Sequence, residues 1–455
     1  MKNGKRSSFS GKLGYVLAAA GASVGLGNIW RFPYLAAKYG GGIFLIIYIV
    51  LALTFGYTMI VAETAIGRMT RKSPVGAFKS FGKKKWLSFG GWINAVIPVL
   101  IVPYYSVIGG WVIKYLVEYF RGNAKLLAED GYFTDFISNG VSTELCFVAF
   151  CAFTLIIIFA GVQNGIERVS KIMMPILIVL SVIIAVYSVT RPGALEGVKY
   201  FLVPNVKNFS WMTVVAAMGQ MFYSLSIAMG ILITFGSYMK KDTAIEDSTR
   251  NVEIFDTGIA IMAGLMIIPA VFAFSGGDPD TLQAGPSLMF ITIPKVFQNM
   301  GFGTVIGIVF FLLVLFAAIT SSIALTESAV STFEDELGWG RKKATVLVGV
   351  IMLALGSLSS LGYGPLAGIK IIGMQFLDLF DFLTNSVMMP IAALLTSLLV
   401  SRVVGIDKIE EEIINGESAF RRKKVFVVMI KYLCPVFAII ILLSSVANAL
   451  GWIKM

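Results

Sequence analysis

The chain contains no histidine among its 455 residues, it has only three cysteines, and charged residues make up just 14% of it. The absence of histidine excludes serine–histidine and cysteine–histidine catalysis, most zinc sites and the HExxH protease motif. The cysteines, Cys146, Cys151 and Cys434, lie in or beside apolar runs without metal-ligand spacing, and we interpret them as packing residues. We therefore expect neither an enzyme nor an organic cofactor.

Hydrophobic residues, in contrast, make up 57% of the chain, and its mean hydropathy is +0.83. Since soluble proteins carry roughly 25% charged residues, this composition predicts an all-α membrane protein with many spans. A helix of about 20 apolar residues crosses the hydrocarbon layer. We place eleven spans at 12–37, 42–69, 88–120, 142–161, 168–190, 211–239, 248–276, 303–333, 343–362, 370–401 and 425–453.

The net charge of +11 does not indicate a nucleic-acid partner, because the basic residues gather in alternate loops. The N-terminus and the basic stretches 68–85, 341–343 and 421–424 fall on one side of the membrane in our span count. The positive-inside rule places that side in the cytoplasm. The lipid bilayer is therefore the first partner that the sequence predicts.

Two of the spans are interrupted by glycine and polar residues, at 20–33 and at 219–230. A helix in lipid bonds its backbone polar groups internally, so an interruption at mid-depth indicates a site for an ion or a charged substrate. The interrupted spans are five helices apart. This spacing predicts one transporter domain with two inverted five-helix repeats, 12–190 and 211–401, and an additional helix at 425–453.

Ionisable and hydroxyl side chains inside the spans allow two interpretations each. The deepest acids are Glu63, Asp256 and Glu327, and each costs roughly 2.5–3.5 kcal/mol to insert, so each needs a partner or a function. They form either interhelical hydrogen bonds or part of a site. The hydroxyls of Thr320 and Ser321 either bond to their own helix or join the broken first helix in an oxygen cage for a monovalent cation.

Two further segments also leave alternatives open. The outer segment 277–302 contains an amphipathic stretch, 290–297, and is either a lid or re-entrant helix or a solvated loop. Gly165 and Pro175 bracket nine residues at the cytoplasmic start of the fifth span. Because glycine is permissive and proline lacks an amide donor, this start is either a turn that unwinds or an ordinary helix start.

Several motifs, in order along residues 6–401, resemble the neurotransmitter:sodium symporter family and within it the bacterial amino-acid transporters. The motifs are Gly-Leu-Gly-Asn-Ile-Trp-Arg-Phe-Pro (25–33), Lys-Tyr-Gly-Gly-Gly (38–42), the stretch 63–68, Tyr104–Tyr105, Ser-Leu-Ser (224–226) and Thr-Ser-Ser (320–322). The first is highly specific, whereas the Tyr-Tyr and Thr-Ser-Ser elements are weak alone. The resemblance implies a fold with discontinuous helices 1 and 6. It also implies sodium-coupled amino-acid import by alternating access across a bacterial plasma membrane.

The resemblance further implies the residues of the site. The first sodium site would consist of Ser23, Asn28, Ser224 and Asp256, with the substrate carboxylate as a further ligand. The second sodium site would consist of the carbonyls of Gly21, Val24 and Ala317 and the hydroxyls of Thr320 and Ser321. The substrate pocket would be lined by Ala22, Gly25, Leu26, Gly27, Ile101, Tyr105, Tyr223, Ser226, Met229, Ser321 and Leu325.

Gates are implied on both sides of this pocket. Tyr105 would bind the carboxylate and cap the site together with Tyr223. Arg31 with Asp381 resembles the outer gate, and Arg6 with Asp335, supported by Tyr238, resembles the inner gate. Glu63 would hold the unwound backbone of helix six.

Departures from the family pattern narrow the expected substrate. Gly25 stands where monoamine carriers have an aspartate, which favours amino acids. Asp256 stands where chloride-dependent members have asparagine, so we expect chloride independence. The pocket carries no charge to meet an ionic side chain, and an unpaired charge is costly to desolvate. Met229 suits branched or aromatic side chains, whereas the methyl of Ala228 would tighten the pocket.

Other classes of function stay open at this point. A channel would show a continuous polar stripe or several like-charged rings, and none is visible. An amino-acid sensor would bind substrate without uphill flux. A carrier of the same fold could also take another solute, for example a compatible solute, or couple to protons. Replacing sodium with potassium at fixed pH separates these alternatives from a sodium symporter.

Overall fold

The computed structural model describes residues 6–276, 285–449 and 452 of the chain, and every regular element in these ranges is a helix. Nine of these helices are long and apolar enough to cross a membrane, or ten if the bent pair Lys12–Ser23 and Gly27–Lys38 is one span. The prediction of an all-α membrane protein is confirmed.

The predicted first repeat contains ten α-helices and three π-helical segments. They are α1 (Lys12–Ser23), η1 (Gly27–Arg31), α2 (Phe32–Lys38), α3 (Gly42–Leu51), η2 (Ala52–Gly56), α4 (Tyr57–Thr70), α5 (Pro74–Lys79), α6 (Lys85–Phe120), α7 (Ala124–Leu127), α8 (Tyr132–Ser138), α9 (Gly140–Phe159), η3 (Val162–Glu167) and α10 (Arg168–Val189).

The rest of the chain continues the pattern of long and short helices. Its elements are α11 (Ala194–Leu202), η4 (Val206–Asn208), α12 (Trp211–Ser224), α13 (Ile231–Tyr238), α14 (Ile245–Ser275), η6 (Leu288–Thr292), α15 (Ile293–Gln298), α16 (Gly303–Leu337), α17 (Arg341–Leu361), α18 (Phe376–Asp381), η7 (Phe382–Met388), α19 (Met389–Leu398), η8 (Leu399–Val404), α20 (Ile406–Ile414), α21 (Lys423–Val428), η9 (Met429–Leu433) and α22 (Cys434–Ala449). The division into repeats at 12–190 and 211–401 stays a prediction.

Both predicted helix interruptions are present. The first span bends by 53° between Ser23 and Gly27. The span predicted at 211–239 is two helices, α12 and α13, joined by non-helical residues 225–230. In this joint Ser226 and Ala228 have φ values of 53° and 58°, which cost a non-glycine residue roughly 1–2 kcal/mol each.

Some predicted boundaries differ from the observed ones. The span predicted at 370–401 begins at Phe376, because Gly373 turns the chain with a φ of 77° and Ile371 pairs with Met374. The fifth span starts as the π-helical segment η3, directly after Gly161 with a φ of 89°. This start is helical rather than unwound.

The outer segment predicted at 277–302 is partly helical. Residues 277–284 lie outside the described residues, and the amphipathic stretch forms η6 and α15. It packs on α6, where the Tyr115 hydroxyl donates to the Phe290 carbonyl at 2.7 Å. The Phe290 ring also stacks on Phe133 with centroids 5.1 Å apart. A solvated loop is therefore the wrong interpretation for 288–298.

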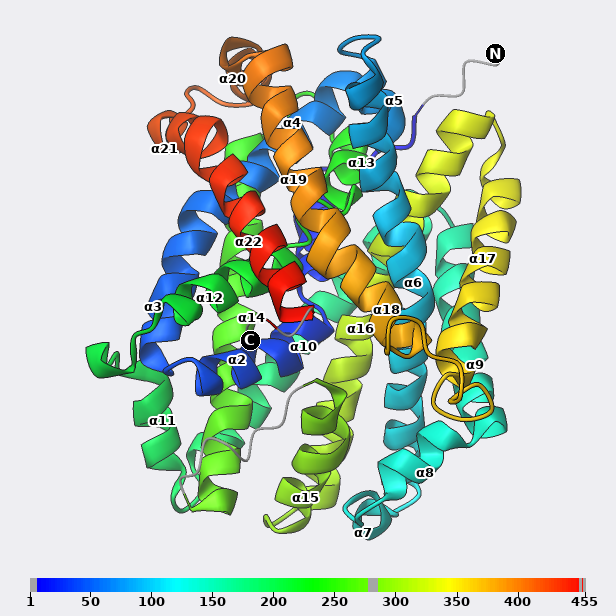
Figure 1. Cartoon of the computed structure of the whole chain (residues 1–455), viewed down its shortest axis with the longest axis vertical. Coiled ribbons are helices and arrows are strands. Elements are labelled where there is room, and N and C mark those ends of the chain that lie inside the picture. The colour runs from blue at the N-terminus through cyan, green and yellow to red at the C-terminus, as the bar shows by residue number, and fades with distance from the viewer. Residues whose placement is uncertain (1–5, 277–284, 450–451, 453–455) are drawn as a thin grey trace.

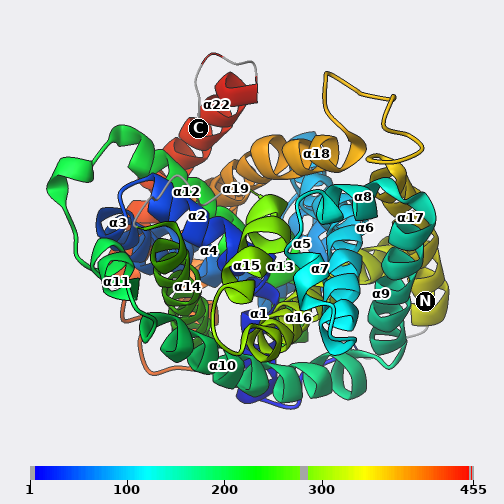
Figure 2. The same cartoon turned by 90° about the horizontal axis from the view of Figure 1, so that it is seen from below.

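The long helices run side by side, with α5 and α20 at one end of the bundle and α7, α8, α11 and α15 at the other (Figure 1). Viewed along the bundle, α9, α10 and α17 lie at the periphery, whereas α1, α12 and α13 run through the middle (Figure 2). Residues 14–23 of α1 are all buried. The first half of the broken first span is thus surrounded by protein rather than by lipid.

Two glycines allow α4 and α13 to cross in close contact. A Cβ atom on Gly67 would lie 2.0 Å from the Ile233 carbonyl oxygen, and one on Gly236 would lie 2.5 Å from the Thr64 carbonyl oxygen. Small residues that let backbones approach are a common basis of helix association in membranes. This crossing fixes the second half of the broken sixth span against the second span.

We expect Gly67→Ala to destabilise the protein by ~1–3 kcal/mol, because the added methyl overlaps backbone atoms that cannot rotate away. The measurement is thermal unfolding of the purified protein in detergent. Gly258→Ala is the matched control, since a Cβ atom on Gly258 of α14 meets nothing within 4 Å. An unfolding temperature of Gly67→Ala equal to that of the control would contradict the proposed crossing.

Candidate functional site

Hydrogen bonds join the two helix interruptions to each other. The Ser226 hydroxyl donates to the Ala22 carbonyl at 3.0 Å, and the Gln220 side-chain amide donates to the Gly27 carbonyl at 3.0 Å. Backbone groups freed inside a membrane need such partners, because no water is available there. The interruptions therefore form one site, as the sequence predicts.

A cluster of polar side chains lies beside this junction and contains three of the four residues predicted for the first sodium site. The Asn28 amide nitrogen lies 2.8 Å from Asp256 Oδ1 and 2.9 Å from the Ser224 hydroxyl. The Ser224 hydroxyl lies 2.9 Å from the same carboxylate. Ser23 lines the neighbouring pocket, but its hydroxyl donates to the Ala19 carbonyl of its own helix at 3.1 Å.

Sequence reasoning missed Tyr48 and Gln220. The Tyr48 hydroxyl donates to Asp256 Oδ2 at 3.0 Å and lies 3.0 Å from the Ser224 hydroxyl. Both missed residues are buried polar groups on apolar helices. Their polarity inside a span is the only sequence signal that could have identified them.

The five residues predicted for the second sodium site also converge. The Ser321 hydroxyl lies 3.2 Å from the Gly21 carbonyl and 3.4 Å from the Val24 carbonyl, and Thr320 Oγ1 lies 3.2 Å from the Ala317 carbonyl. Helices α1 and α16 approach closely here, because a Cβ atom on Gly21 would lie 3.1 Å from Thr320 Cβ. A set of carbonyl and hydroxyl oxygens is suited to a hard cation.

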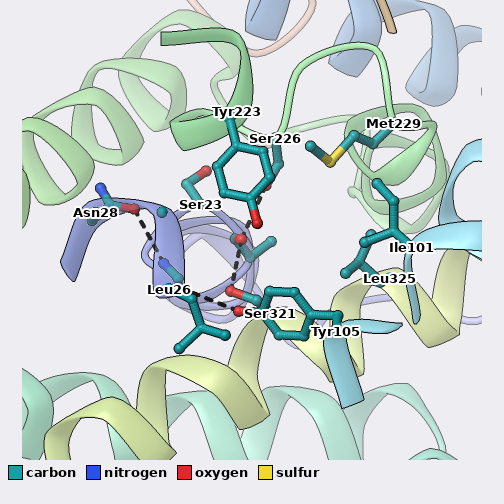
Figure 3. A pocket seen from close by; sticks show the side chains of 13 residues that line it. Ser23, Leu26, Asn28, Ile101, Tyr105, Tyr223, Ser226, Met229, Ser321 and Leu325 are labelled. Carbon is teal, nitrogen blue, oxygen red and sulfur yellow. Dashed lines mark hydrogen bonds between the residues drawn. The ribbon is translucent and has the colours of Figure 1, made fainter. Parts of the chain in front are cut away.

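A small pocket lies next to the Asn28 cluster. It is lined by all eleven residues predicted for the substrate, together with Ser23 and Asn28, and its volume is about 20 Å³. Met229, Ile101 and Leu325 gather on one side, and Asn28 lies on the other (Figure 3). The volume is enough for about one water, so a larger ligand requires side chains to move.

Glu63 lies where its predicted role requires. Its carboxylate is fully buried, and Oε1 accepts the Ala228 backbone N–H at 2.8 Å. Oε2 has no hydrogen-bond partner among the described residues. The expectation that the Ala228 methyl tightens the pocket is wrong, because Ala228 does not line it.

The predicted inner gate is closed. Arg6 Nη1 lies 2.6 Å from Asp335 Oδ1, and the Arg6 guanidinium also donates to the hydroxyls of Ser237 and Ser331, each at 2.9 Å from Nη2. Arg6 lies over the Tyr238 ring at 5.0 Å from its centroid. All three predicted residues are thus brought together at this end.

The predicted outer gate does not form its ion pair. Arg31 lies over the Tyr223 ring at 5.3 Å from the centroid. Asp381 instead accepts hydrogen bonds from Asn385 at 2.6 Å and from the Tyr104 hydroxyl at 3.3 Å. Arg31 and Asp381 both line a cavity of about 530 Å³.

The same outer cavity contains Tyr363, which lies in the loop between α17 and α18. Burial, with the nearby Asp378 carboxylate as a second cause, raises the pKa of Tyr363. The Tyr363 hydroxyl donates to Asp378 Oδ1 at 3.3 Å. The mostly apolar wall of this cavity therefore carries two carboxylates, those of Asp378 and Asp381.

We expect Glu63→Leu to lower the unfolding temperature, because it leaves the buried Ala228 N–H without an acceptor at a cost of about 1–3 kcal/mol. Glu63→Gln keeps an acceptor oxygen of the same shape and is the matched control. Thermal unfolding in detergent compares the two variants. Equal unfolding temperatures would contradict a supporting role of Glu63 for the unwound backbone.

Comparisons with known proteins agree with this geometry. The model of the sodium:neurotransmitter symporter family matches residues 6–130 and 131–452. The uncharacterized sodium-dependent transporter YhdH of Bacillus subtilis is 34% identical over 98% of this chain and 99% of its own length. The sodium- and chloride-dependent GABA transporter 2 of Homo sapiens is 26% identical over 90% of this chain and 75% of its own length.

Among solved structures, MhsT in complex with L-phenylalanine superimposes with a TM-score of 0.86 at 35% identity. The match covers 97% of this chain and 100% of the MhsT chain. The fold class predicted from the sequence is confirmed by this likeness. The chain belongs to the sodium:neurotransmitter symporter family and is a sodium-dependent symporter.

Proposed function

We propose that the chain imports a neutral, mostly apolar L-amino acid together with sodium, by alternating access and without chloride. One observation carries the proposal: the pocket between the broken helices has an apolar side, a polar side and no charged side chain among its described lining residues. Such a pocket fits a zwitterion with a neutral side chain, because an unpaired buried charge is costly.

The main-chain groups of the substrate fit the polar side. The Tyr105 hydroxyl accepts the Leu26 N–H at 3.3 Å, which leaves its own proton for a carboxylate. The helix that begins at Gly27 directs its positive end toward the same place. Ser23 and Asn28 border the pocket here, so a bound carboxylate would complete the first sodium site.

The substrate side chain fits the apolar side, formed by Ile101, Met229 and Leu325. Met229 has three rotatable bonds and adapts to branched or aromatic groups. The complex of MhsT with L-phenylalanine supports an aromatic or similarly sized substrate. No covalent step and no organic cofactor is part of this proposal.

Two sodium ions are proposed, one in each oxygen cluster. Sodium at the Asn28 cluster requires the amide oxygen of Asn28 to face the ion, whereas Asn28 Nδ2 now faces Asp256. Sodium at the second cluster would replace the contacts of the Ser321 hydroxyl with the Gly21 and Val24 carbonyls. The ions would thus order groups that now bond to one another.

The proposed orientation places the N-terminus in the cytoplasm of a bacterium. Asp335 binds both Arg6, near the start of the chain, and the backbone N–H of Ser73, within the basic stretch 68–85. This charge bias supports a cytoplasmic end. The closed Arg6–Asp335 pair then faces inward, and the cavity of about 530 Å³ faces outward.

The test is equilibrium binding of the twenty L-amino acids to the purified protein in sodium chloride, sodium gluconate and potassium chloride. We expect neutral apolar amino acids to bind in both sodium salts and not in potassium. Equal binding in potassium would contradict the proposed sodium sites, and tight binding of a charged amino acid would contradict the proposed substrate. Uphill flux in vesicles separates the transporter from a sensor.

Chloride independence has a separate test. We expect Asp256→Asn to make sodium-dependent binding chloride-dependent, because the variant removes the fixed negative charge beside Ser224 and Tyr48. Binding is compared in chloride and gluconate for the variant and the unmodified protein. A variant that binds equally well in both anions would contradict the proposed role of this charge.

A further inference from the structure

The hydroxyl of Tyr223 is the one phenol at the pocket for which the proposed function provides no hydrogen bond. Tyr223 lines both the small pocket and the outer cavity, so its ring forms the wall between them. Figure 3 shows its hydroxyl directed into the pocket with no hydrogen bond to the residues drawn. A phenol proton that meets no protein acceptor is available to a ligand bound in the pocket.

The ring of Tyr223 is held in place from two sides. On one side it lies against the backbone of the first helix interruption, because a Cβ atom on Gly27 would lie 2.3 Å from Cδ1 and Cε1 of the ring. On the other side the Arg31 guanidinium lies 5.3 Å from the ring centroid. These contacts define the direction in which the hydroxyl points.

The group that Tyr223 meets follows from what surrounds it. Tyr223 and Tyr105 enter the pocket from opposite sides, and Leu26 and Asn28 lie beside the space between them (Figure 3). The apolar side chains of Met229, Ile101 and Leu325 offer nothing that a phenol could bind. Tyr223 therefore serves the side of the pocket where the main-chain groups of an amino acid would lie.

A carboxylate in this place needs several donors. Its two oxygens accept about four hydrogen bonds or cation contacts in total. The proposed function supplies one sodium ion, the Tyr105 hydroxyl and the positive end of the helix that begins at Gly27. The Leu26 N–H is already used by Tyr105, and the Gly25 N–H is used by Asn28 at 3.2 Å. A further donor is required to replace the water that the carboxylate loses.

We propose that Tyr223 donates its hydroxyl proton to the carboxylate of the bound amino acid, as a second phenol opposite Tyr105. This inference rests on the proposed amino-acid substrate and deepens it. The free carboxylate is then held by two phenols and a sodium ion, and it is the most strictly selected part of the substrate. Amino-acid amides are rejected because an amide offers no negative charge to either phenol.

The test is the binding of L-phenylalanine and L-leucine to Tyr223→Phe in sodium chloride. A hydrogen bond from a neutral donor to a charged group predicts about a tenfold or greater rise in Kd, equal for both ligands. Tyr119→Phe is the matched control, because it removes a phenol hydroxyl of the same kind that has no partner among the described residues. Tyr119 lies fourteen residues from Tyr105 on α6, or about 21 Å, and its variant is expected to bind as the unmodified protein does.

A second measurement assigns the contact to the carboxylate. The ratio of the Kd values of L-phenylalaninamide and L-phenylalanine is expected to fall in Tyr223→Phe by the factor that the variant loses for L-phenylalanine. An unchanged Kd for L-phenylalanine would overturn the inference while leaving the proposed function intact. A loss confined to L-serine, L-threonine and L-tyrosine would also overturn it, because the phenol would then bind side chains.

Failure of the unmodified protein to bind any amino acid in sodium would overturn the proposed function itself. Thermal unfolding of Tyr223→Phe tests whether the variant is folded. The substitution keeps the aromatic ring and removes one oxygen atom, so it is expected to leave the packing of the pocket unchanged. The outcomes for the substrate class and for Tyr223 are therefore distinguishable.

Discussion

Unpaired backbone groups inside a membrane are the constraint on which the rest of the structure depends. Opening a helix at mid-depth frees N–H and carbonyl groups that lipid cannot satisfy. Here the Glu63 carboxylate accepts the Ala228 N–H, and Ser226 and Gln220 donate to carbonyls of the other interruption. Each broken helix is therefore stabilised by the other, and this mutual support brings the polar residues of the site together.

The same constraint explains why the site has so few charges. Each buried charge requires a partner, and the described cluster around Asn28 contains one carboxylate, Asp256. This carboxylate is surrounded by neutral donors from three helices, among them Tyr48 and Ser224. Such donors stabilise a negative charge without cancelling it, so the charge stays available to attract a cation. An arginine or lysine partner would have removed that attraction.

Much of this arrangement could be predicted from the sequence, because the helix interruptions are local. The glycine-rich stretch 20–33 and the polar stretch 219–230 identify both breaks, and apolar length identifies the spans. The pairing of Tyr48 with Asp256 could not be predicted, since it depends on how α3 turns toward α14. Arg31 was predicted to pair with Asp381, whereas it lies over Tyr223. The sequence could not decide between these two partners, because both line the same cavity as Arg31.

That competition at Arg31 connects the substrate to the outer gate. A ligand changes a conformational equilibrium only through different affinities for the two states. Arg31 now lies on Tyr223, and Asp381, its predicted partner, lines the same cavity without an ion pair to it. Under the proposed function a substrate contact fixes the Tyr223 ring. Because Arg31 lies over this ring, the position of Arg31 then depends on whether substrate is bound. A substrate that binds more tightly when Arg31 pairs with Asp381 would then close the outer side, while Arg6 and Asp335 hold the inner side.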